Sequence, residues 1–310
     1  MSGTQAVTPA PVQLPKQPVE YGKKRRGVPE VIHKAPFWVK LVLVLVCVGW
    51  FVPVFGLGIT SFRPQDDATT TGWWTIFTDP SSLTRLTLEN YSDVFERADM
   101  GTAFVNSLAI TLPATIIPIL IAAFAAYAFT FMQFPGRDLL LILIVALLVV
   151  PTQVALVPLL QIYGNLGLNG TFLAIWLAHI GFGMPLAVYI IRNYMATLPK
   201  EVIESAKIDG ASHFQTFWRL ILPMSTPVLA SFAIFQFLWV WNDLLNALVF
   251  IGSGDNKPLT IALVQLLGAQ GQGWQLVTAG AFFTMIVPII VFLSLQRYFV
   301  RGMTAGAVKG

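Results

Sequence analysis

Six uncharged apolar runs dominate the sequence, and each is long enough to cross a lipid bilayer. A helix needs about 20 apolar residues to cross a hydrocarbon core of roughly 30 Å. Because lipid cannot hydrogen-bond an exposed backbone, we expect these runs to be helical. The expected spans are Leu41–Phe62, Ala103–Met132, Leu139–Leu160, Phe172–Ile191, Met224–Ile251 (interrupted by Asn242-Asp243) and Leu276–Phe299. The sequence therefore predicts an all-α integral membrane protein with six transmembrane helices.

The composition excludes a soluble domain and offers little for a metal or catalytic site. Hydrophobic residues make up 55% of the chain and charged residues 11%, whereas charged residues reach about a quarter of a typical soluble domain. Cys47 is the single cysteine, which excludes an internal disulfide or a cysteine-based metal site. His33, His179 and His213 show no metal-ligand spacing. His179 lies inside the fourth expected span, where either a functional role or neutral helix packing fits. We assign no metal ligand and no catalytic residue.

Basic residues gather on one side of the expected spans, which predicts the orientation. Fifteen of the nineteen Lys and Arg residues fall on the same side as the two termini. The opposite side holds only Arg63, Arg85, Arg97 and Lys257. By the positive-inside rule both termini are cytoplasmic, and so is the connection after the fourth span. This bias accounts for the net charge of +4, so nucleic-acid binding is not expected.

The chain divides into a tail and one membrane domain. Residues 1–36 are rich in proline and predict a disordered cytoplasmic tail, followed by the six-helix domain at 37–310. The basic run Lys23–Arg26 suits a topogenic cluster better than a lipid-binding patch. Every expected span contains a proline, which predicts kinked helices.

The segment 199–223 is polar and helix-forming, in a chain that has little such sequence. Pro199-Lys200-Glu201 is a good helix start, with an acid near the positive helix end. Asp209-Gly210 predicts a helix end with glycine in the left-handed conformation. Ser212 can cap a second helix, and Pro223 permits a sharp return to the membrane. On this pattern alone, an ordinary amphipathic loop and a docking element fit equally well.

This segment resembles the cytoplasmic motif of ABC importer permeases: Glu-Ala-Ala, three residues, Gly, nine residues, then Ile, any residue and Leu-Pro. Glu204, Ala206, Gly210, Leu222 and Pro223 match at the family spacing, and Ser205 and Leu220 are conservative departures. Further matches point to the carbohydrate branch and its maltose-type second permease: Leu88-Glu89-Asn90-Tyr91, Asn106-Ser107-Leu108, Phe134-Pro135-Gly136-Arg137, Leu198-Pro199, Ile208-Asp209-Gly210-Ala211, Trp241-Asn242-Asp243 and the ending Thr304–Gly310. The resemblance covers roughly residues 37–310.

The resemblance implies a permease subunit of a bacterial sugar importer in the inner membrane, with a maltose-like or α-glucoside-like solute. In such a family member, Glu204, Ser205, Ala206, Asp209, Gly210, Leu222 and Pro223 would couple the permease to its ATPase. The implied partners are a homologous permease, two ATPase subunits, an extracytoplasmic sugar-binding protein and membrane lipid. The chain contains no Gly-x-x-x-x-Gly-Lys-Ser/Thr motif. We therefore expect no cofactor in this chain, with ATP and Mg bound by the partner ATPase, and we expect no enzymatic activity.

Two further sets of residues are candidates for contact with the solute and its binding protein. Amide, carboxylate and indole groups near the outer end of the fifth span suit a sugar path; they are Gln236, Trp239, Trp241, Asn242 and Asp243. Helix packing and interfacial anchoring explain them equally well. In the maltose-type family the sugar site lies mainly in the partner permease. The polar end of Pro258–Trp274 is expected to form a partly inserted hairpin that contacts the binding protein through Gln265, Gln270, Gln272 and Trp274.

Two other functions remain open at this point. A membrane enzyme would need catalytic groups converging at one depth, and the spans offer only His179 and Asp243. The second is an importer permease of the same type for a non-sugar organic solute such as glycerol phosphate; a phosphate ligand would favour Arg or Lys in the path. The spans contain neither, which favours a neutral sugar.

Overall fold

The computed structural model describes residues 36–252, 254–267 and 273–305, and this part of the chain is helical without strands. The expected tail at 1–36 lies almost wholly outside these residues. The helices are α1 (Phe37–Thr60), α2 (Gln65–Thr70), α3 (Thr75–Thr78), α4 (Ser81–Thr84), α5 (Glu89–Ala98), α6 (Met100–Phe131), α7 (Arg137–Ala146), η1 (Leu147–Val149), α8 (Thr152–Asn165), α9 (Phe172–Met195), α10 (Lys200–Ile208), α11 (His213–Thr216), η2 (Phe217–Ile221), α12 (Leu222–Met224), α13 (Thr226–Trp241), α14 (Leu245–Phe250), α15 (Leu259–Gln265) and α16 (Trp274–Ala305).

The chain divides into two compact units, Met1–Trp50 and Phe51–Gly310, with the boundary inside α1. In the first unit the described part of α1 is apolar and exposed on nearly all sides. A helix that is hydrophobic all round is typical of a membrane span. The second unit carries all the sites discussed below.

The expected membrane helices are present, although two of them are not straight. Within the described residues, α1, α6, α9 and α16 are long and apolar enough to cross a membrane. Two bent pairs bring the total to six if each pair counts as one span. The fold class predicted from the sequence is therefore confirmed.

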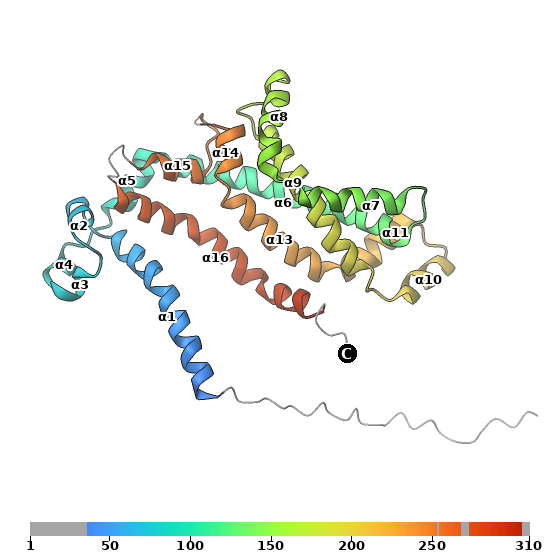
Figure 1. Cartoon of the computed structure of the whole chain (residues 1–310), viewed down its shortest axis with the longest axis horizontal. Helices are drawn as coiled ribbons and strands as arrows, with labels where there is room; N and C mark the ends of the chain where they lie inside the picture. The colour runs from blue at the N-terminus through green and yellow to red at the C-terminus, as the bar shows by residue number, and fades with distance from the viewer. Residues whose placement is uncertain (1–35, 253, 268–272, 306–310) are drawn as a thin grey trace, which may run out of the picture. The chain divides into compact units, whose positions relative to one another are not determined.

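The span expected at Leu139–Leu160 is bent much more sharply than a proline kink. The helices α7 and α8 meet at an angle of 100°, a corner that is plain in Figure 1. Val150 is extended, with φ −75° and ψ 119°, and Pro151 begins the new direction. Proline removes a backbone donor and disfavours a helical residue before it, so the break falls where the chemistry requires one.

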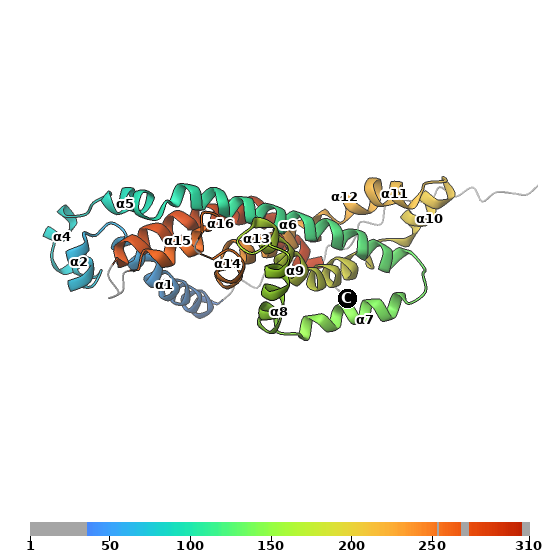
Figure 2. The same cartoon turned by 90° about the horizontal axis from the view of Figure 1, so that it is seen from above.

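The helix α6 is the central element of the second unit. It packs most extensively against α9, and α13 packs against both α6 and α16. The contacts between α6 and α9 use small side chains, including Ala122, Ala123, Ala126 and Ala187, which are fully buried. Small residues let helix backbones approach closely, as is usual in membrane bundles. In both views α5 and α15 lie by one end of α6, and α10 and α11 lie by the other (Figures 1 and 2).

Near the N-terminal end of α6, called its first end below, buried polar side chains bind backbone groups. Asn90 donates hydrogen bonds to the carbonyls of Ser61 and Arg63, at 2.9 and 2.8 Å, and so closes the C-terminus of α1. The guanidinium of Arg63 is buried and donates to the carbonyls of Thr71 and Asp67. Burial lowers the pKa of Arg63 from its ordinary value. These bonds organise the region that holds α2 to α5.

Two neighbouring residues of α6 hold the chain that precedes α15. Asn106 donates to the carbonyls of Asp255 and Lys257, and the Ser107 hydroxyl accepts from the amide of Leu259 at 2.8 Å. The helix α15 then buries Leu259, Ile261 and Ala262. Leu259–Gln265 is therefore a packed helix, and the tip of the expected hairpin, residues 268–272, lies outside the described residues.

Candidate functional site

The polar segment 199–223 begins with the helix α10, which ends where the sequence predicted. Glu201 lies in its first turn and Lys207 in its last, each favourable to the helix dipole. Gly210 has a φ of +78°. The amide of Ala211 donates to the carbonyl of Ala206 at 2.9 Å, and the amide of Gly210 to that of Lys207 at 3.1 Å. This pair of bonds is a Schellman cap, which needs a left-handed residue at Gly210.

The second helix of the segment begins with a complete capping box. The Ser212 hydroxyl accepts from the amide of Gln215, and the Gln215 side chain accepts from the amide of Ser212. A π-helical turn, η2, follows, and such turns are frequent at functional sites. The chain bends by 71° between α12 and α13. The bend falls at the buried Ser225, just beyond Pro223, where the sequence predicted the return to the membrane.

Aromatic contacts fix this segment to the C-terminal end of α6, called its second end below. Phe217 stacks on Phe124 with ring centroids 4.3 Å apart. The Tyr127 hydroxyl lies 3.0 Å from Nδ1 of His213, at hydrogen-bonding distance. Ile203, Ala206 and Phe217 are buried beneath the segment. The inner face of the segment is therefore packed against α6, and the outer face does not take part in this packing.

The outer face of the segment exposes both polar and large apolar side chains. Glu204, Ser205 and Asp209 are exposed, as are Gly210 and Pro223, whereas Ala206 is buried and Leu222 half-buried. Ile208 is 86% exposed and Phe214 is 66% exposed. These two apolar side chains are therefore open to contact with another protein. The sequence pattern identified the polar residues but gave no reason to single out Ile208.

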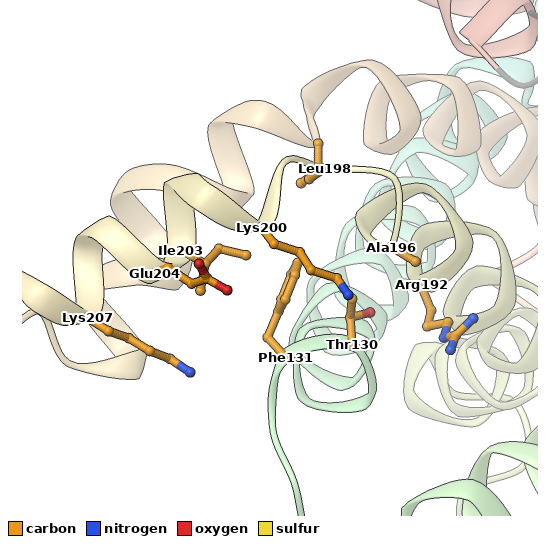
Figure 3. A pocket seen from close by; sticks show the side chains of 9 residues that line it. All are labelled: Thr130, Phe131, Arg192, Ala196, Leu198, Lys200, Ile203, Glu204 and Lys207. Carbon is orange, nitrogen blue, oxygen red and sulfur yellow. The ribbon is translucent and has the colours of Figure 1, made fainter.

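Two cavities flank α10. One, of about 350 Å³, is lined by the residues drawn in Figure 3: Thr130, Phe131, Arg192, Ala196, Leu198, Lys200, Ile203, Glu204 and Lys207. The other, of about 470 Å³, lies between α10 and the second helix and is lined by Val202, Ser205, Ala206, Asp209, Ala211, Gln215, Thr216, Arg219 and Leu220. A cavity therefore lies on each of two sides of α10. Glu204 lines the first, and Ser205 and Asp209 line the second.

The charged side chains in the first cavity form no ion pair with any residue that the structure describes. The ion pairs among the described residues involve Arg85, Arg97, Arg137 and His179, and none reaches Glu204. Figure 3 shows Lys200 extending towards Thr130, while Glu204 and Lys207 leave α10 on the same side. These charges are available to a molecule outside the chain.

The proposed path residues on α13 divide into exposed and packed side chains. Trp239 is partly exposed and lines a third cavity, of about 380 Å³, at the corner between η1 and α8. Gln236 lines the same cavity and donates to the carbonyl of Ala114 at 3.1 Å. A Cβ at Gly183 would lie 2.8 Å from the Gln236 amide, so glycine makes room for it. Trp239 and Gln236 give this cavity an aromatic surface and an amide.

Trp241 and Asn242 are committed to contacts within the bundle. Trp241 is buried, stacks on Phe237 and donates from its indole to the carbonyl of Thr284 at 3.2 Å. Asn242 is exposed and its amide donates to the carbonyl of Leu238 at 2.7 Å. The role of both residues in a solute path stays a prediction.

Asp243 and His179 form a buried contact at the break between α13 and α14. Nε2 of His179 lies 3.4 Å from Oδ2 of Asp243, and the His179 ring meets the face of Trp239 edge-on. His179 is fully buried. The Asp243 carbonyl also accepts from the Thr260 hydroxyl at 2.9 Å. The pair therefore links α9, the helix break and α15.

The expected binding-protein contacts are only partly visible. Gln265 is exposed and accepts from the Lys257 ammonium at 3.1 Å, and Trp274 is half-exposed at the start of α16. Gln270 and Gln272 lie outside the described residues. Arg192 and Thr130 were missed as site residues. Arg192 directly follows the fourth expected span, Phe172–Ile191, and a base at this place is the sequence signal that could have indicated the cavity.

Comparisons with known proteins agree on one family. Residues 118–305 match the family described as binding-protein-dependent transport system inner membrane component. The osmoprotective compounds uptake permease protein GgtD of Synechocystis sp. is 56% identical over 89% of this chain and 95% of its own length. The alpha-glucoside transport system permease protein AglG of Rhizobium meliloti is 57% identical over 76% of this chain and 63% of its own length.

A more distant relative and a solved structure extend this picture. The trehalose transport system permease protein SugB of Mycobacterium tuberculosis is 32% identical over 90% of this chain and 99% of its own. A chain of a bacterial alginate ABC transporter, solved in complex with an alginate pentasaccharide-bound periplasmic protein, superimposes with a TM-score of 0.61. It shares 14% identity and the alignment covers 84% of this chain and 93% of that one, so it supports the fold.

Proposed function

The chain belongs to the family of binding-protein-dependent transport system inner membrane components, and from this premise we propose that it carries a neutral α-glucoside across the membrane. It is a permease of an ABC importer, a transport subunit and not an enzyme. We infer that it encloses the solute path with a homologous permease and works with two ATPase subunits and an extracytoplasmic binding protein. ATP and Mg would be bound by the ATPase.

One observation supports the coupling role above others: Glu204 lies exposed on a capped helix without an ion-pair partner among the described residues. A carboxylate in that position is free to pair with a base of the ATPase. Gly210 and the exposed side chains of Ile208 and Phe214 complete the docking face. The inner face, fixed to α6 through Phe217, would pass movement of the ATPase to the spans.

The solute class follows from the names of the relatives and from the chemistry of the path. Three relatives are named for the uptake of osmoprotective compounds, alpha-glucosides and trehalose. Trehalose is itself an α-linked glucose disaccharide, so a neutral α-glucoside that protects against osmotic stress satisfies all three names. The apolar third cavity with Trp239 and Gln236 suits a sugar ring better than an ion.

A transport experiment tests this function. The complex is reconstituted in vesicles with its binding protein and ATP, and uptake of trehalose, maltose and glycerol phosphate is compared. We expect uptake of at least one α-glucoside and none of glycerol phosphate. Uptake of the charged solute alone would contradict the proposal.

The orientation needs a separate test. Cysteine replaces Asp255 or His213 in a Cys47→Ala background; both positions are exposed, and they lie near opposite ends of α6. A membrane-impermeant thiol reagent should label position 255 in intact cells and leave 213 unlabelled until the cells are opened. The reverse pattern would refute cytoplasmic termini.

A further inference from the structure

The cavity drawn in Figure 3 carries an excess of positive charge. Arg192, Lys200 and Lys207 line it together with one carboxylate, Glu204. The ion pairs of the described residues include none of these four side chains. Three cations facing one carboxylate leave two positive charges without compensation.

Arg192 is the member of this set that most needs a partner. Its Nη1 donates to the neighbouring Asn193 at 3.3 Å, whereas its Nε is buried and has no hydrogen-bond partner in the described part of the chain. Lys200 is the first residue of α10, whose N-terminus has no side-chain cap. The helix dipole therefore adds to the positive potential at Lys200. A phosphate, with several strong acceptor oxygens, fits this donor set.

The position of the cavity identifies the kind of molecule. Phe131 is the last residue of α6, and Arg192 lies in the last turn of α9. Both helices are long and apolar enough to span a membrane, so their ends reach the depth of the lipid headgroups. Phe131, Leu198 and Ile203 add an apolar wall. A soluble phosphate ester would leave that wall uncovered, whereas the glycerol and first methylenes of a lipid would pack against it.

We propose that this cavity binds the phosphate of an anionic phospholipid headgroup. The phosphate bridges Arg192 on α9 and Lys200 on α10. It fixes the angle of α10 against the spans and leaves Glu204 exposed for a partner. The inference rests on the proposed function only for this last consequence, that lipid occupancy sets the efficiency of coupling.

Lipid retention tests the site without reference to transport. The assembled complex is placed in nanodiscs of phosphatidylcholine with phosphatidylglycerol, released in the mass spectrometer, and the retained lipid is counted. Arg192→Gln/Lys200→Gln should lose the retained phosphatidylglycerol, with about fivefold weaker binding for each cation removed. Arg192→Lys/Lys200→Arg keeps both charges and should retain it. The control Arg85→Gln/Arg97→Gln removes two cations elsewhere and should bind as the wild type does.

Two outcomes would overturn the proposal. The first is equal retention of phosphatidylglycerol in the wild type and in the Arg192→Gln/Lys200→Gln variant. The second is tight binding of inorganic phosphate or glycerol phosphate to the complex in detergent, which would make the site one for a soluble ester. If the lipid is retained as expected but solute uptake fails, the proposed function falls and the lipid site stands.

The consequence for coupling is measured in the same nanodiscs. ATP hydrolysis stimulated by the loaded binding protein should rise when phosphatidylglycerol replaces part of the phosphatidylcholine. This rise should vanish in Arg192→Gln/Lys200→Gln and persist in Arg85→Gln/Arg97→Gln. An unchanged response in the first variant would contradict a role for the site in coupling.

Discussion

The two ends of α6 use polar residues in opposite ways. At the first, N-terminal end, the side chains of Asn106 and Ser107 form hydrogen bonds with the backbone of residues 255–259. At the second end, Phe124 and Tyr127 hold the polar segment by aromatic contacts, and the nearby charges of Arg192, Lys200 and Glu204 form no ion pair with other described residues. A polar group that already has a partner maintains the fold, whereas one without a partner is available for binding.

This difference separates residues that look alike in sequence. Asn106-Ser107-Leu108 and Glu204-Ser205-Ala206 both resemble the permease family, and both are short polar stretches next to apolar runs. In the structure, the side chains of the first stretch hold residues 255–259 by hydrogen bonds, whereas Glu204 and Ser205 of the second are exposed. Substitutions at the first end should therefore lower stability, and substitutions at the second should lower activity in a stable protein.

The largest effect is expected from Gly210→Val. A side chain with φ near +78° is strained, by about 1–2 kcal/mol, although no atom lies within 4 Å of the new Cβ. The turn should open and misplace the whole docking face, Glu204 included, so the loss of uptake should exceed that of Glu204→Ala; about 1.4 kcal/mol of lost docking energy is already a factor of ten. Vesicle uptake measures this.

Gly136→Val is the matched control for that strain. Gly136 has a φ of +79° and the same open space around its Cβ, but it lies outside the segment 199–223. It should keep most of the uptake. An equal loss in both variants would mean that backbone strain, and not docking, limits transport.

Glu204→Ala should come next in size. The carboxylate has no partner within the described residues, so its removal should leave the thermal midpoint unchanged. The lost pairing with the ATPase should cost about 1.5–3 kcal/mol, or more than tenfold in uptake. Glu201→Ala, on the same helix and also exposed, should transport normally. A large drop in the thermal midpoint of Glu204→Ala would assign it a structural role.

Asn106→Ala tests the other side of the comparison. It removes two hydrogen bonds and leaves the carbonyls of Asp255 and Lys257 without their donor, at a cost of about 1–3 kcal/mol. Its main effect should appear as a lower thermal midpoint of the purified complex. Full stability together with abolished uptake would break the distinction between the two ends of α6.

The smallest effect is expected at the buried pair in the bundle. His179→Asn and Asp243→Asn should each reduce stability, and the double variant should cost less than the sum of both. The coupling energy of such a pair lies at about 0.5–3 kcal/mol. The thermal midpoints of the wild type, the two single variants and the double variant give this coupling energy by a double-mutant cycle. Strict additivity would mean that the 3.4 Å contact carries no energy.

Local chemistry explains how much of this was predictable from the sequence. Apolar runs gave the class and most spans, and Gly210 and Ser212 gave the boundaries of the polar segment, because caps and left-handed residues leave a signal in a few neighbouring residues. The corner at Pro151 was missed because a proline inside an apolar run fits a kinked span as well as a broken one. The cavity of Arg192 and Lys200 was missed because it joins α6, α9 and α10, and no local pattern records such a meeting.

Photocrosslinking at the outer face of the segment tests the central claim most directly. A benzoylphenylalanine replaces Ile208, the exposed apolar residue beside Gly210, in the intact complex. The matched position is Leu88, which is 69% exposed near the other end of α6. We predict a crosslink to the ATPase subunit from position 208 and none from position 88. Absence of an ATPase crosslink from 208, or an ATPase crosslink from 88, would contradict the account.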